Sequence, residues 1–335
     1  MIPKKVILDC DPGSDDAIAM MLAMKSDAID LIGVTTVNGN RIVPKTTENA
    51  LRVVQFMKAS VPVYRGCEEP IICNEIPGRK PGLPRVTLND CHGDFLPLPE
   101  AEIRTEKEHA VFYLVKTLME SEGDIYVAAV GPLTNLAMAL RIEPKIAGKI
   151  KQLVIMGGGH CGANASPAAE FNFYADPEAA KIVMDSAIPK VILPLDATWR
   201  ACLSEEKCKE LAQLGTPEAK VAAALVQKRI DNLKVNDVSE HNYALRHQAG
   251  TVAGAMLYRY DNHMAPIHDA LAIAYLINEN VVTELADANV DVDIAGGLCD
   301  GRMVADFHNT KKCKAPVTAK VALNSDAGLF TDMLF

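Results

Sequence analysis

The sequence predicts an α/β fold, in which a single domain has an open, mostly parallel sheet with helices on both faces. Runs typical of strands and runs typical of helices alternate along the chain, an order that builds a parallel sheet through right-handed crossovers. The first strand-like run, residues 6–8, is wholly apolar, as expected of a strand buried on both faces. Several such runs end at a polar or glycine-rich turn. One edge of this Rossmann-like sheet should therefore collect ligand-binding groups.

The composition is that of a globular protein with a sizeable core. The chain has 335 residues, 49% hydrophobic and 23% charged, and no hinge-like segment divides it, so we expect one domain over residues 1–335. The net charge of -9 is spread without long blocks, which favours a small molecule over a nucleic-acid polymer or a membrane as partner. The nine cysteines include no CxxC pair, which favours a reducing compartment. Because no signal peptide or membrane span is visible, we expect a cytoplasmic protein.

The N-terminal half alternates strands and helices. The strand at residues 6–8 leads to a helix at residues 17–24, which is apolar on nearly every side and is therefore expected inside the core. A strand rich in β-branched residues, 29–37, follows and ends at an Asn-Gly-Asn turn. Residues 66–100 hold many Pro and Gly, the kind of long connection that is often functional. The other expected elements are a helix at 46–59, a strand at 61–64, a helix at 106–122, a strand at 125–130 and a helix at 133–140.

The C-terminal half continues the alternation and adds extra helices. A strand at residues 153–156 runs into three glycines, and residues 160–174 form a loop before a helix that starts at Asp176. A polar interruption at residues 232–242 fits a mobile lid and an ordinary solvated connection equally well. The remaining elements are a strand at 191–195 that closes at Asp196, a mainly helical stretch from 204 to about 260, an apolar helix opened by His268 and Asp269, and strands at 281–294 and 302–307 that include an antiparallel edge.

Four carboxylates lie within eight residues, where the first strand ends and the first helix begins: Asp9, Asp11, Asp15 and Asp16. Asp9 and Asp11 are two apart, so they point the same way if both are extended. Grouped anions raise one another's pKa unless a cation sits among them, and no Lys or Arg lies between Lys5 and Lys25. Acids can also simply complement a helix N-terminus, but four fit that explanation poorly. A hard cation such as calcium, magnesium or manganese is therefore expected.

A second acidic group opens the helix at His268 and Asp269. The pair by itself is a weak signal, because a histidine before a helical aspartate is often just a capping residue. If this helix begins at the same edge of the sheet, then Asp11, Asp16 and Asp269 form a calcium cage and the carbonyl of Val130 is a plausible further ligand. Asp15 is then left for substrate, with His268 beside it as a proton donor.

Other chemistries fit the sequence less well. The three glycines at 157–159 do not form a GxGxxG that opens a helix, and no GxxxxGK[ST] is present, so nucleotide-phosphate loops are unsupported. A serious alternative is a magnesium-dependent phosphatase of the haloacid dehalogenase type, whose DxD matches Asp9 and Asp11. These enzymes usually have Thr or Val next, whereas Pro12 and Gly13 follow here.

The chain resembles the nucleoside hydrolase family. Residues 9–17, DCDPGSDDA, are similar to the DxDPGxDDA signature of that family, which is highly specific. The resemblance continues through most of the chain, in TTVNGN at 35–40, HG at 92–93, GPLTN at 131–135, MGGG at 156–159, EFN at 170–172 and HD at 268–269. It implies a single catalytic domain that hydrolyses the N-glycosidic bond of ribonucleosides to free base and ribose with one calcium ion. Relatives suggest a homodimer or homotetramer.

The resemblance also implies a role for each matching residue. The calcium ligands match Asp11, Asp16, Asp269 and the backbone carbonyl of Val130. Asp11 also matches the general base that activates the attacking water, and His268 the acid that protonates the leaving base. The ribose contacts match Asp15, Asn40, Asn164, Glu170 and Asn172. Met156 matches a residue that lines the sugar pocket, and His92 one near the base.

The base preference is left open by the sequence. His268 resembles the inosine/uridine type of the family, since the purine-specific type has Trp before the aspartate. However, the interval from Asp196 to His268 is longer than expected of that type, and Trp199 stands where a His is common in relatives. A third interpretation, a noncatalytic calcium-dependent nucleoside-binding protein, is disfavoured because the candidate base and sugar contacts are all present.

Overall fold

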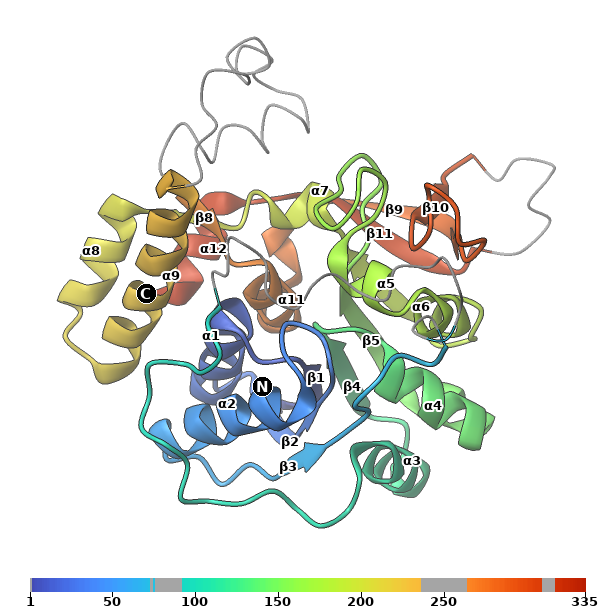
Figure 1. Ribbon diagram of the computed structural model, residues 1–335, viewed down its shortest axis with the longest axis horizontal. Coiled ribbons are helices and arrows are strands. Elements are labelled where there is room, and N and C mark those ends of the chain that lie inside the picture. Colours follow the sequence, from blue (N-terminus) through green and yellow to red (C-terminus); the bar gives the residue numbers. More distant parts are fainter. Residues whose placement is uncertain (1, 73–74, 76–91, 236–263, 309–316) are drawn as a thin grey trace, which may run out of the picture.

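The computed structural model of the protein describes residues 2–72, 75, 92–235, 264–308 and 317–335 (Figure 1). These residues form a nine-stranded sheet in the order β10-β9-β11-β6-β5-β4-β1-β2-β3 and a two-stranded sheet of β7 and β8. The strands of the large sheet are β1 Lys4–Cys10, β2 Ile29–Thr36, β3 Val63–Arg65, β4 Ile125–Ala129, β5 Ile150–Met156, β6 Lys190–Leu193, β9 Val282–Val292, β10 Met303–Asp306 and β11 Ala319–Ser325. The small sheet pairs β7 Cys202–Ser204 with β8 Met264–Pro266 in antiparallel fashion.

The strand directions confirm the predicted fold class. The sheet is parallel from β3 to β11, since each neighbouring pair in this series runs the same way. β9 pairs antiparallel with both β11 and β10, which makes the expected antiparallel edge. Parallel strands need a crossover connection, and the helices between them supply it.

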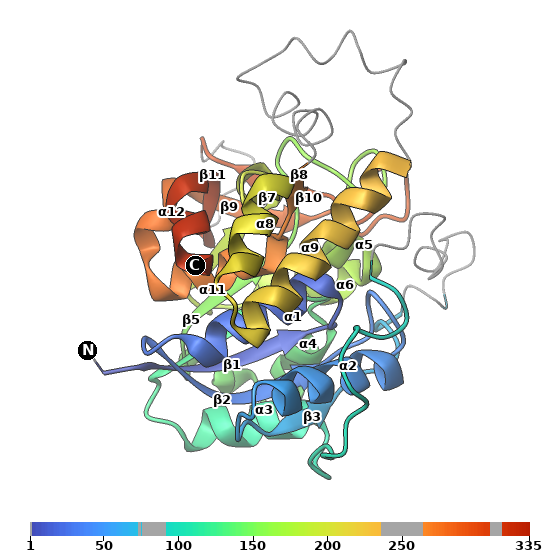
Figure 2. The ribbon, with the colours of Figure 1, turned by 90° about the vertical axis from the view of Figure 1, so that its left-hand side faces the viewer.

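Helices cover both faces of the sheet (Figures 1 and 2). Side chains alternate along β1, so Val6, Leu8 and Cys10 join one apolar core while Ile7 joins the other. The first core is built with α1 Ser14–Lys25, α2 Val43–Phe56, α8 Glu205–Gln213, α9 Pro217–Val235, α11 His268–Ile277 and α12 Ala327–Leu334. The second is built with α3 Ala110–Glu120, α4 Thr134–Ile142 and α6 Pro177–Met184.

Several predicted boundaries needed correction. α2 begins three residues earlier than expected, at Val43, because Pro44 suits the first turn of a helix. α3 begins only at Ala110, where the side chain of His109 accepts a hydrogen bond from the Val111 N–H and caps the helix. The strand expected to reach residue 195 ends at Leu193, before Pro194.

Several further elements were not predicted, among them the strands β7 and β8 of the small sheet and the C-terminal helix α12. The expected loop at 160–174 holds most of a short helix, α5 Phe171–Ala175, and another short helix, α7 Leu195–Thr198, follows β6. The strand β11 was missed, although it separates β6 from β9 in the sheet. Most of the polar interruption at 232–242 and part of the connection at 66–100 lie outside the described residues.

The two helices that carry the candidate acids begin close together. α1 packs against α11, and nine of its twelve residues are buried, as expected of a helix inside the core. Asp11 follows β1, Asn40 follows β2, Val130 follows β4 and Met156 ends β5, all at the carboxyl edge of the parallel strands. The edge therefore carries groups from four neighbouring strands.

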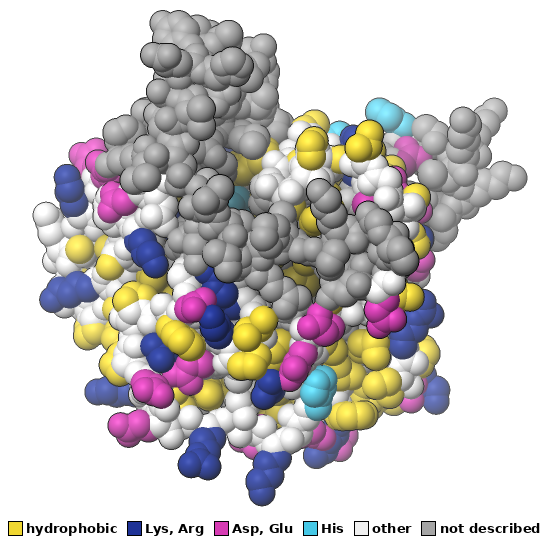
Figure 3. Space-filling view, viewed as in Figure 1, with side chains coloured by type: hydrophobic (Ala, Val, Ile, Leu, Met, Phe, Trp, Pro, Cys, Tyr) yellow, Lys and Arg dark blue, Asp and Glu magenta, His cyan; other side chains and the backbone are white. Residues whose placement is uncertain are grey.

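The surface agrees with a small-molecule partner. On the face drawn in Figure 3, basic and acidic side chains are interspersed over the described residues rather than gathered into a patch of one sign. Among the described residues, we find no helix with both the length and the apolar character that crossing a bilayer requires.

Candidate active site

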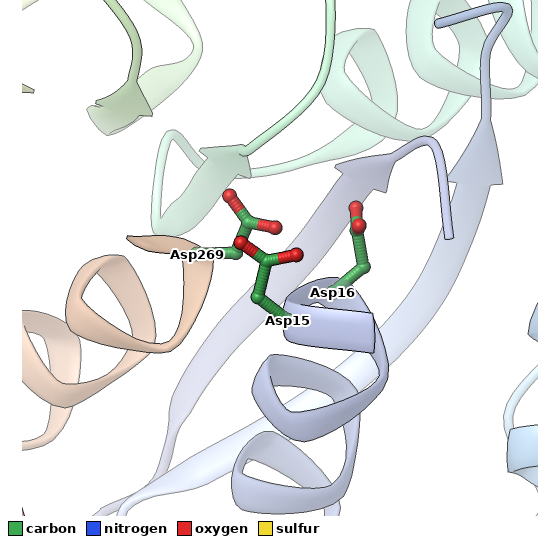
Figure 4. A group of neighbouring side chains, drawn as sticks. All are labelled: Asp15, Asp16 and Asp269. Carbon is green, nitrogen blue, oxygen red and sulfur yellow. The ribbon is translucent and has the colours of Figure 1, made fainter. Parts of the chain in front are cut away.

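Three buried carboxylates meet where α1 and α11 begin (Figure 4). Asp15 and Asp16 come from the first turn of α1 and Asp269 from the first turn of α11. Each offers an oxygen atom that lies within 4.8 Å of an oxygen of the other two. Residues 253 positions apart in the sequence therefore form one acidic cluster.

Asp11 lies beside this cluster in a tight backbone enclosure. Its Oδ2 accepts a hydrogen bond from the Asn40 N–H at 2.5 Å. A Cβ on Gly131 would lie 2.7 Å from Oδ1 of Asp11, and one on Gly39 would collide with Oδ2. Only glycine therefore lets the turns after β2 and β4 approach this carboxylate so closely.

Asp16 is tied to the same turns. Its Oδ2 accepts hydrogen bonds from the Gly13 N–H at 2.9 Å and from Nδ2 of Asn40 at 3.2 Å, and its Oδ1 accepts from the Asp11 N–H at 3.2 Å. Asn40 thus contacts both Asp11 and Asp16. The backbone N–H of Asn40 binds the Asp11 carboxylate, and its side-chain amide binds the Asp16 carboxylate.

The carboxylates destabilise one another's charge. Burial, followed by the charge of Asp16, raises the pKa of Asp11 well above its ordinary value. Burial and Asp15 raise the pKa of Asp16 to about 6. Burial, with Asp15 and Asp16, likewise raises the pKa of Asp269. A buried set of oxygen donors that is unfavourable as bare anions fits a hard cation, which would make the ionised forms favourable.

Asp15 differs from the other three acids. Burial by itself would raise its pKa, but the charges of Arg229, His92 and His268 together lower it. Nη1 of Arg229 donates to Oδ1 of Asp15 at 2.6 Å, and Nδ1 of His92 lies 3.8 Å from the same oxygen. Asp15 is therefore held as an anion by basic groups of the chain itself.

Arg229 is the residue that sequence reasoning missed. It lies on α9, 214 positions from Asp15, and its side chain is buried. A signal was present, because Arg229 stands one turn after Leu225 and three residues after Val226, on the apolar stripe of the helix. A charged residue on a buried stripe indicates a partner, although the pattern does not say which one.

The two histidines lie on the Asp15 side of the cluster. Nδ1 of His92 accepts a hydrogen bond from the Ser14 N–H at 3.1 Å. Nδ1 of His268 lies 2.8 Å from Oγ1 of Thr198, a partner that the sequence did not suggest. Both rings are thereby fixed near Asp15.

The expected sugar contacts gather at the ends of β4 and β5. Glu170 accepts hydrogen bonds from the N–H groups of Gly158, Asn172 and Phe173, and its burial raises its pKa to about 7. Nδ2 of Asn172 donates to the carbonyls of Val130 at 2.8 Å and Met156 at 3.0 Å. Asn172 therefore links the ends of β4 and β5 through these two carbonyls.

Asn164 is set apart from this buried group. Its side chain is exposed, and its Oδ1 accepts a hydrogen bond from the Phe171 N–H at 2.9 Å. The contact lies next to Glu170, so Asn164 supports the start of α5. The structure thus brings the loop to the site without burying this side chain there.

Asp9 has a separate environment from Asp11. Its Oδ1 accepts hydrogen bonds from Oγ1 of Thr35 at 2.5 Å and Nδ2 of Asn135 at 2.7 Å, and burial raises its pKa to about 6. β1 ends at Cys10, so Asp11 lies in the turn that follows the strand. The expectation that Asp9 and Asp11 point the same way if both are extended therefore does not apply. Asp9 therefore joins β1 to β2 and α4 beneath the site.

Buried acids with histidines beside them at the carboxyl edge of a parallel sheet are typical of metal-dependent hydrolases. The chain belongs to the inosine-uridine preferring nucleoside hydrolase family, whose model matches residues 6–332. The predicted family and enzyme class are thus confirmed, and the phosphatase alternative is removed.

Named relatives match over nearly the whole chain. The pyrimidine-specific ribonucleoside hydrolase RihB of Escherichia coli O157:H7 is 36% identical over 337 aligned positions, which cover 98% of this chain and 95% of the relative. A plant nucleoside hydrolase structure is 27% identical with a TM-score of 0.82, covering 99% of this chain and 98% of that one. The purine-preferring ribonucleoside hydrolase from Gardnerella vaginalis is 25% identical with a TM-score of 0.82, covering 99% and 96%.

Proposed function

We propose that this nucleoside hydrolase is calcium-dependent, acts on pyrimidine ribonucleosides and releases free base and ribose. The observation that supports a metal is the buried cluster of Asp15, Asp16 and Asp269, with Asp11 bonded to Asp16 beside it and the Val130 carbonyl at the end of the neighbouring strand β4. All are oxygen donors, the kind that calcium prefers. When bound, the ion would hold sugar hydroxyls and the attacking water in place and offset the charge of the acids.

Asp11, rather than Asp15, is assigned to the metal ion. The compact group of three oxygen atoms contains Asp15 rather than Asp11. However, Oδ1 of Asp15 is already bonded to Arg229, whereas Oδ1 of Asp11 faces Gly131, next to the Val130 carbonyl. We therefore assign Asp11, Asp16, Asp269 and Val130 to the ion and Asp15 to the substrate.

Two residues transfer protons in the proposed reaction. Asp11 accepts a proton from the attacking water, a role that suits a carboxylate whose pKa burial has raised. As the base departs, the sugar becomes oxocarbenium-like, and the surrounding carboxylates stabilise its positive charge. His268 gives a proton to the leaving base. Because Thr198 holds Nδ1 of this ring, we assign the donated proton to Nε2.

The remaining predicted residues bind the substrate. Asp15, Asn40, Asn164, Glu170 and Asn172 contact ribose hydroxyls, Met156 lines the sugar pocket and His92 lies near the base. Asn40 is bonded to Asp11 and Asp16, and Asn172 is bonded to Glu170 and to the Val130 carbonyl at the end of β4, which supports this arrangement. The pyrimidine preference rests on the RihB relatives, which are pyrimidine-specific by name and 36% identical.

We also propose one catalytic domain over residues 1–335, a cytoplasmic location and a homodimer or homotetramer. The family match over residues 6–332 supports the single domain. The cysteines of the described residues are free thiols, which suits a reducing compartment. Size-exclusion chromatography with light scattering measures the oligomeric state.

The test is a substrate panel with and without chelator. Uridine, cytidine, inosine, guanosine and adenosine are incubated with the protein, and free base and reducing sugar are measured. We expect equal amounts of base and sugar, fastest release from uridine or cytidine, loss with chelator and recovery with calcium. Binding without turnover would instead indicate the noncatalytic protein, and faster purine release would refute the pyrimidine preference. His268→Ala should lower kcat more than it raises KM.

A further inference from the structure

Arg229 connects α9 to the first turn of α1. Its Nη1 donates to Oδ1 of Asp15 at 2.6 Å and to Oγ of Ser14 at 3.1 Å, and the side chains of Arg229 and Asp15 are both buried. α9 packs against α1 along this contact (Figure 2). Two bonds to neighbouring residues fix the guanidinium in one place, so it constrains the direction of the Asp15 carboxylate.

The position of Asp15 means that this constraint affects whether Asp15 can bind a metal ion. An oxygen of Asp15 lies within 4.8 Å of oxygens of Asp16 and Asp269, close enough for all three to bind one ion. A guanidinium bonded to a carboxylate occupies one of its lone pairs and offsets its negative charge, which makes the carboxylate a weaker metal ligand. The ion pair therefore competes with metal coordination by Asp15.

We propose that Arg229 is a positioning residue that keeps Asp15 out of the metal's coordination shell and reserves it for the ribose hydroxyls. The inference rests on the proposed calcium site. It explains why three of the four adjacent carboxylates bind the ion while Asp15 binds the sugar. Arg229 also offsets one of the four negative charges. Its removal should therefore change metal affinity and catalysis in opposite directions.

The electrostatic reasoning gives an ordered series of variants. Arg229→Gln removes a positive charge beside the cation site, so calcium should bind about tenfold more tightly or better. Asp15→Asn removes a negative charge and should weaken calcium binding by a similar factor. The double variant Asp15→Asn/Arg229→Gln has the same net charge as the wild type and should bind calcium with nearly wild-type affinity.

Calorimetric titration of calcium into the metal-free, full-length protein measures this series. Lys220→Gln is the matched control, because Lys220 is exposed on the same helix and its loss should leave the affinity unchanged. Equal or weaker calcium binding by a folded Arg229→Gln variant would overturn the proposal. So would a double variant that binds calcium far more weakly than the wild type, since Asp15 would then be a ligand itself.

Kinetics provide a second readout that general structural damage would not reproduce. Arg229→Gln should lower kcat/KM for the best ribonucleoside at saturating calcium, and Arg229→Lys should restore part of it. If Arg229→Gln does not fold, the comparison of Asp15→Asn with the double variant still applies, and the second change should tighten calcium binding about tenfold. A wild type that binds calcium but hydrolyses no ribonucleoside would refute the proposed function. The calcium affinities of the variants would still test the proposed role of Arg229.

Discussion

Replacing Asp269 with Asn should stabilise the metal-free protein and destabilise the calcium-bound one. The carboxylate of Asp269 is buried, and its oxygen lies within 4.8 Å of oxygens of Asp15 and Asp16. Asp15 and then Asp16 are the charges that raise the pKa of Asp269 most, and Arg229, which is paired with Asp15, offsets part of this repulsion. Two unit charges at this upper limit of 4.8 Å repel by about 3.5 kcal/mol at an effective dielectric constant of about 20. We therefore expect the metal-free variant to gain about 3 kcal/mol of unfolding free energy at pH 8.

The pH dependence has a definite sign. The pKa of Asp269 is raised in the folded state by burial and by Asp15 and Asp16, so the folded protein binds this proton more tightly than the unfolded chain does. The stabilising contribution of protonated Asp269 is fully present below the ordinary pKa of 3.8, and it is lost as the pH rises through the folded-state pKa. The advantage of the variant should therefore be large at pH 8 and vanish near pH 4.

Urea unfolding in chelator and in calcium provides the assay. In calcium the order should reverse, because the wild type gains binding free energy that the variant lacks. Asp27→Asn is the control, since Asp27 is exposed and its replacement should change stability by less than about 0.5 kcal/mol in either condition. A metal-free variant at pH 8 that is no more stable than the wild type would refute the repulsion argument.

Three further predictions concern groups around the cluster. Asp11→Asn should lower kcat about 10²–10⁴-fold, the usual contribution of a general base, with an unchanged circular dichroism spectrum, and near-normal turnover would contradict the assignment. Gly131→Ala should cost about 1–3 kcal/mol of stability and reduce activity, because its Cβ would lie 2.7 Å from Asp11. Gly148→Ala is the control, since a Cβ there would have no atom within 4 Å, and it should change neither the melting temperature nor the rate. The pKa of Asp9 is raised from 3.8 to about 6, so between pH 4 and pH 8 the wild type should lose about 2.5 kcal/mol of stability relative to Asp9→Asn. A difference in unfolding free energy between the two proteins that stays constant over this pH range in urea titrations would refute this.

The local chemistry of the sequence predicted much of the site. Asp11, Asp15 and Asp16 follow an apolar strand and precede an apolar helix, so their place at the edge of the sheet followed from chain order and periodicity. His268 and Asp269 open another apolar helix, which suggested the same edge. The boundaries of α2 and α3 were less well predicted, because capping by His109 and the first-turn proline are decided by one or two residues.

Short-range patterns and motifs were enough to predict the fold class, the acidic edge and the family. The partners of the individual acids could be identified only from the packing of the folded chain. Asp9 is bonded to Thr35 and Asn135, Asp16 shares Asn40 with Asp11, and Asp15 is paired with Arg229. These choices depend on how α9 packs on α1 and how β2 and β4 flank β1. Such packing is set by the shapes of many distant side chains, which no local pattern records.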